Sequence, residues 1–341
     1  MNSNPQVGTG QQAGPPLYGR QWSLEVSTTD VQQVIAPITG GTFSPETLRI
    51  TFDVHTPCFQ NAYWYADIVI YNLSKIGSDI IIKAAPNVQT GMIVTLKAGY
   101  VGGQGQYDVI WVGPVFQPTF LRENVTDYKL TLHCILALLP AISGEIQSTV
   151  YSGMNQSEIV SAMIEQLGLE LQTELPAKLS NKTLPRDKVV IDPVAALNDI
   201  AKDNKLVWFL SQRNLTPGNT GIYFGDVSAD IPTTAAYTYT PTTGLLDTPV
   251  QTPFGIDFSV LLDPRIRAQI PWQVVEVKEV VIQQNLVQPQ QSQIQRPLAS
   301  DGQYVVFDIH HRGDSRGAIW QTDLTTYSVV GDILLSVIGG S

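Results

Sequence analysis

Apolar and polar residues alternate along several short segments in the first 140 residues of the chain. Trp22–Val26, Leu48–Val54 and Tyr128–Ile135 each place apolar side chains at every second position. Side chains of a β-strand point alternately to its two faces, so this pattern predicts strands with one buried and one polar face. In the third segment we expect Tyr128, Leu130 and Leu132 to point inward.

Three further segments, rich in β-branched and aromatic residues, form the centre of this region. Tyr65–Ser74, Met92–Tyr100 and Tyr107–Gly113 are bounded by Gly, Asn or Ser, which is typical of strands. We expect the three to form a meander. The Gly-rich stretch 101–106 predicts a hairpin, and the apolar Ile80–Ile82 predicts a covered connection or a short extra strand.

The periodicity becomes helical in the middle of the chain. Ser157–Gly168 has apolar residues at helical spacing, and Ser157 is the expected N-cap. A second helix is predicted after the cap residue Asp192, with Pro193 at its first position. A predicted hairpin completes a small α/β unit, and its strands are Val207–Leu210 and Gly221–Gly225.

Strand-like segments return in the last third. After a Thr- and Tyr-rich stretch at 233–241, the predicted strands are 255–262, 272–282 and, as the last one, Tyr304–His310. The Gln-rich segment Gln283–Gln295 predicts an extended polar hairpin tip or loop. Many antiparallel strands joined by short turns indicate sandwiches or barrels.

Composition points to a subunit of an assembly. Only 15% of the residues are charged, and the formal net charge is −10. Free surfaces are normally kept charged for solubility, so a low share is typical of a surface that partners cover. No Lys or Arg cluster interrupts the acidic balance, which argues against a protein that reads or wraps nucleic acid. Residues 1–20 have few apolar anchors and predict a disordered arm.

The cysteines and apolar runs exclude other classes. Cys58 and Cys134 form no Cys-x-x-Cys pair, so we expect two half-buried thiols in a reducing compartment. Nothing at the N-terminus resembles a signal peptide, and the apolar run 329–338 is too short to span a bilayer. We therefore expect no stable membrane association.

Two regions carry a family resemblance. Ala66–Ser74, the Val-rich strand ending Ala98-Gly-Tyr100, the Gly-rich hairpin and the aromatic strand closing on Gly113 resemble the first domain of baseplate hub proteins of contractile-tailed bacteriophages. Gly302–Thr322 resembles the closing segment of that family. Gly105-Gln-Tyr107 and Gly302-Gln-Tyr304 also echo each other, which fits a family built from two tube-like domains.

The resemblance implies a mainly β fold with a small α/β insert and two tail-tube-like antiparallel β-barrel or sandwich domains. The implied division is an arm at 1–20, a first β domain at 21–140, an α/β domain at 141–232 and a second β domain at 233–341. It further implies a homotrimer in the virion baseplate, assembled in the host cytoplasm. Its partners would be the tail tube and spike proteins, with tape-measure and wedge proteins as further contacts, and DNA would pass without specific binding.

Candidate chemistry is sparse. His310, His311 and Asp314 form one polar cluster, but adjacent histidines on a strand face opposite sides, so a polar strand end turning at Gly313 is the expected reading rather than a metal site. Asp53, His55 and Cys58 form a second group, and His133 and Cys134 a third. Neither has the base and orienting group that a nucleophile needs. We expect no catalytic, cofactor or metal site.

Arg312-Gly313-Asp314 is also the tripeptide that integrin ligands display. Here it predicts a turn in which Asp314 pairs locally with Arg312 or Arg316, as a structural ion pair or a contact between subunits. Two alternatives to the hub stay open. One is a carbohydrate-binding or host-surface adhesin, with exposed aromatic residues along a groove. The other is a tail-associated cell-wall hydrolase, which needs a carboxylate pair in a cleft.

Overall fold

The computed structural model describes most of the chain in fourteen stretches. These are residues 19–28, 34–41, 47–58, 63–84, 92–102, 106–136, 148–181, 188–211, 221–226, 231–252, 255–268, 272–278, 282–284 and 302–328. The predicted arm lies outside them up to residue 18, as do most of the Gln-rich segment and the apolar run 329–338. Among the described residues, no helix is both long and apolar enough to cross a bilayer.

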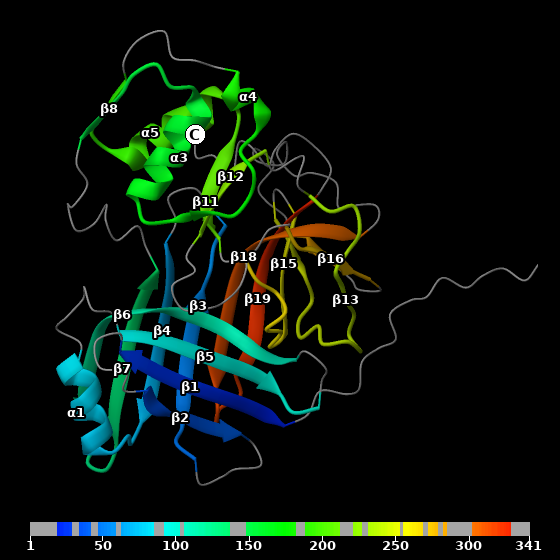
Figure 1. Ribbon diagram of the computed structural model, residues 1–341. Helices are drawn as coiled ribbons and strands as arrows, with labels where there is room; N and C mark the ends of the chain where they lie inside the picture. The colour runs from blue at the N-terminus through cyan, green and yellow to red at the C-terminus, as the bar shows by residue number, and fades with distance from the viewer. Residues whose placement is uncertain are drawn as a thin grey trace, which may run out of the picture.

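A first β unit contains seven strands and one helix (Figure 1). They are β1 (Arg20–Thr28), β2 (Val34–Gly41), β3 (Ile50–His55), β4 (Trp64–Tyr71), α1 (Lys75–Ala84), β5 (Met92–Tyr100), β6 (Tyr107–Arg122) and β7 (Tyr128–Leu136). The first half of β6 pairs with β5 and its second half with β7. This long strand therefore joins β3-β4-β7 and β5-β1-β2 into one sheet.

The predicted meander is wrong at its first step. β4 pairs with β3 and β7, whereas β5 pairs with β1 and β6, so the hairpin prediction holds only for β5 and β6. Helix α1 lies where a covered connection or short strand was expected. The Ser74 hydroxyl accepts a hydrogen bond from the Gly77 N–H and so caps this helix, and Ile81 is fully buried.

The α/β unit follows the sequence prediction closely. Its elements are β8 (Thr149–Tyr151), α3 (Gln156–Gln166), β9 (Glu170–Leu171), α4 (Ala177–Ser180), β10 (Lys188–Val190), α5 (Pro193–Asp203), β11 (Val207–Ser211) and β12 (Gly221–Gly225). Asp192 caps α5 as predicted, and β11 and β12 form the predicted hairpin. The N-cap of α3 is Asn155, not Ser157, because Asn155 and Glu158 form a reciprocal capping box.

The second β unit holds the remaining strands. They are β13 (Tyr237–Tyr239), β14 (Val250–Gln251), β15 (Ile256–Leu261), β16 (Val274–Val277), β17 (Gln283–Gln284), β18 (Gln303–Asp314) and β19 (Trp320–Ser328). The prediction that the last strand ends at His310 is wrong, since β18 continues to Asp314 and β19 follows. Gly313 lies inside β18 and not in a turn, and its lack of a side chain makes room for the Phe52 ring of β3.

One continuous sheet joins the two β units. Its strand order is β17-β14-β15-β19-β18-β3-β4-β7-β6-β5-β1-β2, and the β18–β3 pair forms the seam between the units (Figure 1). One hydrophobic core runs beneath both units, while the α/β unit has a core cluster of its own. Phe209 of β11 contacts Trp272 of the second β unit, with ring centroids 4.9 Å apart. The predicted domain boundaries stay predictions.

Candidate functional site

The continuous sheet presents one apolar and one polar face. Along β3, β4, β7, β15 and β19 the side chains alternate between buried and half-buried positions. Tyr128, expected to point inward, is 40% exposed, because it lies beyond the core at the end of β7. We call the half-buried side the polar sheet face. Its ionisable side chains in this region include Asp53, His55, Tyr65, Asp67, Lys129, His133, Asp257, Asp308, His310, Arg312 and Asp323.

A reciprocal pair of Asp-x-His segments spans the seam. Asp53 and His55 lie on β3, and Asp308 and His310 lie on β18, with His55 directly opposite His310. His310 Nε2 lies 2.5 Å from Asp53 Oδ1, and His55 Nε2 lies 2.7 Å from Asp308 Oδ1. Each histidine therefore reaches the aspartate of the other β unit.

Neighbouring strands carry further carboxylate pairs. His133 Nδ1 of β7 lies 2.7 Å from Asp67 Oδ1 of β4. Arg312 donates its Nε–H to Asp323 at 2.6 Å, and the Ser259 hydroxyl donates to the same carboxylate at 2.7 Å. Three of the four histidines in the chain thus contact an aspartate on this face.

The pairing shifts the acidity of the carboxylates. The hydrogen bond from His310 lowers the pKa of Asp53 below its usual value. Burial raises the pKa of Asp257, which lies on β15 at the other side of β19. Asp257 on the outer strand is therefore a weaker acid than Asp53 at the seam.

A shallow groove lies in the polar sheet face beside the seam. It has a volume of about 370 Å³, and its lining includes His55, His310, Asp257, Asp308 and Asp323. The groove brings together residues that sequence analysis placed in separate groups. Asp257, Asp308 and Asp323 were missed, although the repeated Asp-x-His spacing was a signal for Asp308.

His311 faces the opposite side of β18, as the alternation predicts. It is 2% exposed, and its Nδ1 lies 2.8 Å from the Thr322 hydroxyl oxygen. Burial lowers its pKa to about 4, so this imidazole is neutral near pH 7. It cannot share a ligand with His310.

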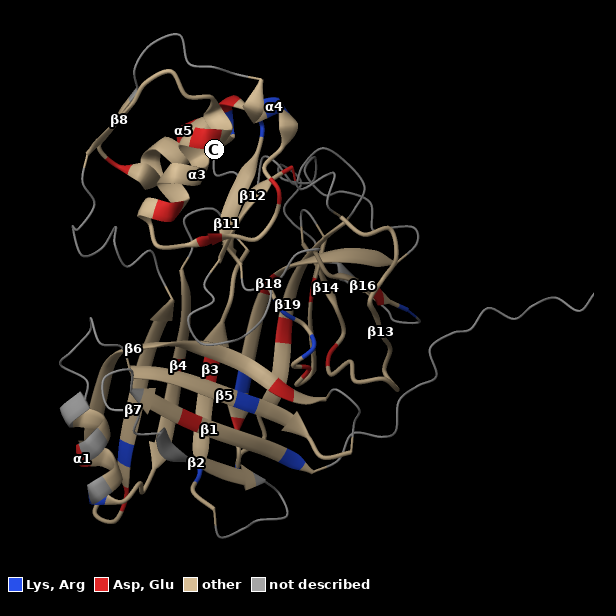
Figure 2. Ribbon diagram, viewed as in Figure 1, with Lys and Arg blue, Asp and Glu red and all other residues tan. Residues whose placement is uncertain are grey.

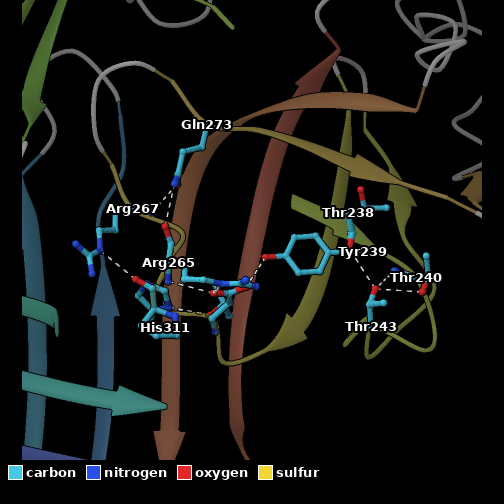
Figure 3. Close-up of polar contacts among 11 residues, drawn as sticks. Thr238, Tyr239, Thr240, Thr243, Arg265, Arg267, Gln273 and His311 are labelled. Atoms are coloured by element: carbon cyan, nitrogen blue, oxygen red, sulfur yellow. Dashed lines mark hydrogen bonds and ion pairs between the residues drawn. The ribbon is translucent and has the colours of Figure 1, made fainter. Parts of the chain in front are cut away.

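A network of polar contacts lies beside His311 (Figure 3). Asp263, 2% exposed, accepts hydrogen bonds from the Tyr239 hydroxyl at 2.8 Å and from Arg265 Nε at 2.8 Å. Arg267, from the same loop, forms an ion pair with Asp108 of β6. The loop thus links the second β unit to the first.

The Arg-Gly-Asp tripeptide is part of the seam, and the predicted local pairing is wrong. The Asp314 carboxylate accepts two hydrogen bonds from Arg49, at 3.1 and 2.7 Å, and its carbonyl oxygen accepts one from Arg20. Arg312 pairs with Asp323 instead, and Arg316 donates its backbone N–H to the Asp314 carboxylate. The tripeptide holds the two β units together.

The two cysteines carry no site. Cys58 and Cys134 are free thiols, 3% and 1% exposed, rather than half-buried. Burial raises the pKa of both thiols far above the usual range. Cys58 therefore does not act with His55, whose ring lies on the polar sheet face. Within the described chain, no group of three or more His, Cys, Asp or Glu side chains is arranged to hold a metal ion.

Comparison with known proteins rests on structure. No family model and no curated protein matches the chain. The E. coli c3393 protein is a type VI secretion system component with structural similarity to the phage T4 tail proteins gp27 and gp5. It matches with a TM-score of 0.53 and 8% identity, over 89% of this chain and 76% of its own. The 43 kDa tail protein of prophage MuSo2 from Shewanella oneidensis has a TM-score of 0.51 and 9% identity, over 90% of this chain and 97% of its own.

A further tail protein, from Neisseria meningitidis MC58, has a TM-score of 0.50 and 10% identity, over 93% of this chain and 98% of its own. At such identities the likeness establishes the fold. The predicted mainly β architecture is confirmed. The chain therefore has the fold of bacteriophage tail proteins, as the sequence resemblance predicts.

Proposed function

We propose that this chain is a structural subunit of a contractile phage tail, a baseplate hub protein that forms a trimeric ring. The observation that carries the proposal is the continuous sheet. Both β units contribute strands to it, and one face covers the core while the other is polar. In a ring of such subunits, the polar sheet faces would line a central channel.

The charges on this face suit a channel that DNA passes without sticking. Cationic side chains bind nucleic acid by neutralising phosphates. On the polar sheet face, Arg312, His55, His133 and His310 each contact an aspartate. Figure 2 shows Lys or Arg and Asp or Glu positions on strands of the continuous sheet. With a formal net charge of −10, the subunit offers phosphates little attraction.

The same pairing favours a structural over an enzymatic role. The hydrolase alternative needs an acid and a base presented to a substrate. In the groove, Asp308 contacts His55, and Asp323 is held by Arg312 and Ser259. These carboxylates support neighbouring strands, so we infer that the subunit works mechanically and not as an enzyme.

The proposed partners follow from the ring. One rim would bind the hexameric tail tube and the other the trimeric spike, with tape-measure and wedge proteins as further contacts. The subunit would then reside in the virion baseplate. Two similar β units per chain give a trimer six similar positions, which is the number that a hexameric tube needs.

The test is the mass of the purified protein in solution, measured by light scattering alone and after mixing with the tube and spike proteins of the same tail. The proposal predicts a trimer, either alone or on addition of the spike. A chain that stays monomeric at every concentration and in both mixtures would contradict it.

A further inference from the structure

We propose that a second copy of this chain extends the continuous sheet at the second half of β6, repeating the contact that β18 makes with β3. The inference rests on the proposed function, because the ring it builds is the hub ring. It goes further by assigning the strands and the residue register of the contact between copies.

The β6–β7 and β18–β19 hairpins have the same pairing pattern, including one shift in register. In β6 the register shifts between Val115 and Gln117, whose partners on β7 are Cys134 and His133. In β18 it shifts between Val306 and Asp308, whose partners on β19 are Thr326 and Thr325. These bulges give a common frame for the two hairpins.

In this frame Phe120 corresponds to His311, Leu121 to Arg312 and Tyr128 to Trp320. Tyr304 corresponds to Gly113, not to Tyr107. The Gly-Gln-Tyr echo in the sequence is therefore out of register with the structural repeat.

The neighbouring strands match as well. β7 pairs with β4, and β4 pairs with β3. β19 pairs with β15, and β15 pairs with β14. All four pairs are antiparallel. The chain thus contains the run β3-β4-β7-β6 and, beside it, the run β14-β15-β19-β18, with β3 in the place of β14.

The two runs differ in whether another strand pairs with the outer edge of their last strand. β3 covers β18, and there His311 and Trp320 are each only 2% exposed. The Phe52 ring of β3 lies 5.1 Å from the Trp320 ring. At this seam, β3, the first strand of the other run, buries aromatic and polar side chains of β18 and β19.

The corresponding edge of β6 has no such cover. Within the described chain, no strand pairs with β6 beyond Pro114 on the side away from β7. Phe120, Tyr128 and Leu121 are 38%, 40% and 55% exposed, although Phe120 and Tyr128 occupy the positions of the buried His311 and Trp320. An open edge flanked by exposed apolar side chains is a surface that pairs with another strand.

The partner of the open β6 edge is the opposite end of the continuous sheet in a second copy of the chain. At the seam the last strand of one run meets the first strand of the next run. The first strand of the second run is β14, near the opposite end of the continuous sheet, with β17 on its outer edge. A contact between β6 of one copy and this end of another is head-to-tail, and such contacts build closed rings when the rotation closes.

The register follows from the seam. There Arg312 lies opposite Asp53, and the corresponding residues are Leu121 of β6 and Val250 of β14. Leu121 should therefore lie next to Val250 of the neighbouring copy, or next to Gln283 if β17 stays between them.

Disulfide crosslinking tests the register. Leu121→Cys is combined with Val250→Cys or with Gln283→Cys and oxidised under the condition in which the wild-type chain oligomerises. The native thiols are buried and should not interfere. Covalent dimers and trimers in either double variant, and none in the single variants, are expected. An oligomer that forms no crosslink in either double variant would overturn the inference and leave the proposed ring intact.

A second variant tests the edge without crosslinks. Leu121→Asp should raise the dissociation constant of the oligomer at least tenfold. Val189→Asp, at a residue 62% exposed on the α/β unit, is the matched control and should leave it unchanged. Circular dichroism would establish that both variants fold. Equal oligomerisation of the folded Leu121→Asp variant and wild type would overturn the inference, whereas a wild-type chain that never oligomerises would contradict the proposed function itself.

Discussion

His55 and His310 lie opposite each other on β3 and β18, with ring centroids 5.3 Å apart, and each reaches the aspartate two residues from the other. One Asp-x-His segment comes from each β unit. The seam thus combines backbone pairing with two crossed His–Asp contacts, whose geometry depends on the register. A slip of one residue would turn every one of these side chains to the other face.

Replacing Asp53 with Asn should make the seam less stable at neutral pH. The native pKa of Asp53 is lowered, so its contribution is present above the unfolded pKa and is lost as the pH falls through the folded value. Because the side chain is 43% exposed, we expect a loss of about 0–1 kcal/mol. Urea unfolding at pH 7 and at low pH measures it. A difference that persisted in acid would contradict the assignment.

His311 should give the protein a separate pH dependence. Its folded pKa, about 4, lies below the unfolded value, so the unfolded state binds more protons between them. The contribution of His311 to the free energy of unfolding should be fully present above a pH of about 6.5. It should fall by on the order of 3 kcal/mol as the pH approaches 4. His311→Gln should flatten this slope in urea unfolding from pH 4 to 7. An unchanged slope would rule out His311 as its source.

Asp263 should be among the most sensitive positions in the second β unit. Asp263→Asn leaves the partly buried Arg265 without its charge partner, and breaking such a pair costs about 3–5 kcal/mol. Asp247→Asn, at an exposed residue, is the control and should stay within about 0.5 kcal/mol of wild type. Denaturant unfolding of both variants is the measurement. Equal effects would show that the buried network contributes little.

Gly313→Ala should weaken the seam through packing alone. An added methyl group would meet the Phe52 ring, and overpacking of this kind costs about 1–3 kcal/mol. Phe52→Leu in the same chain should recover part of the loss, because the smaller side chain makes room. Thermal unfolding of the single and double variants tests this. Additive losses would place the strain elsewhere.

The two thiols should react only after unfolding. Burial removes Cys58 and Cys134 from solvent and raises the pKa of both. A thiol reagent therefore cannot reach either sulfur, and neither is present as the reactive thiolate. A thiol reagent that releases a chromophore on reaction measures this. Its absorbance should stay near zero with the native protein and correspond to both cysteines in denaturant. Fast reaction of the native protein would contradict their burial.

Much of the fold could be predicted from periodicity. The half-buried strands β3 and β4 and the caps of α5 have local signals. Helix α1 was missed because its only strong start signal is Ser74, and its three consecutive isoleucines read equally well as a strand. Strand β19 was missed because Gly313 suggested a turn, although glycine there makes room for a ring from a distant strand.

The site could not be assembled from the sequence because it depends on register between strands far apart in the chain. Asp53 and His310 each stood out as chemistry-bearing residues, but in separate groups. Only the β18–β3 pairing brings them together, and the same pairing sends Asp314 to Arg49. Side chains on adjacent positions, such as His310 and His311, were correctly separated because alternation is a local property.

The most direct test of the account is electron cryomicroscopy of the purified oligomer, alone or bound to the spike. We expect a ring of three chains around a central opening, with Asp53, His55, His310 and Asp323 of the polar sheet face turned toward that opening. A ring whose polar sheet faces lie on the outside, or an assembly without a central opening, would contradict it.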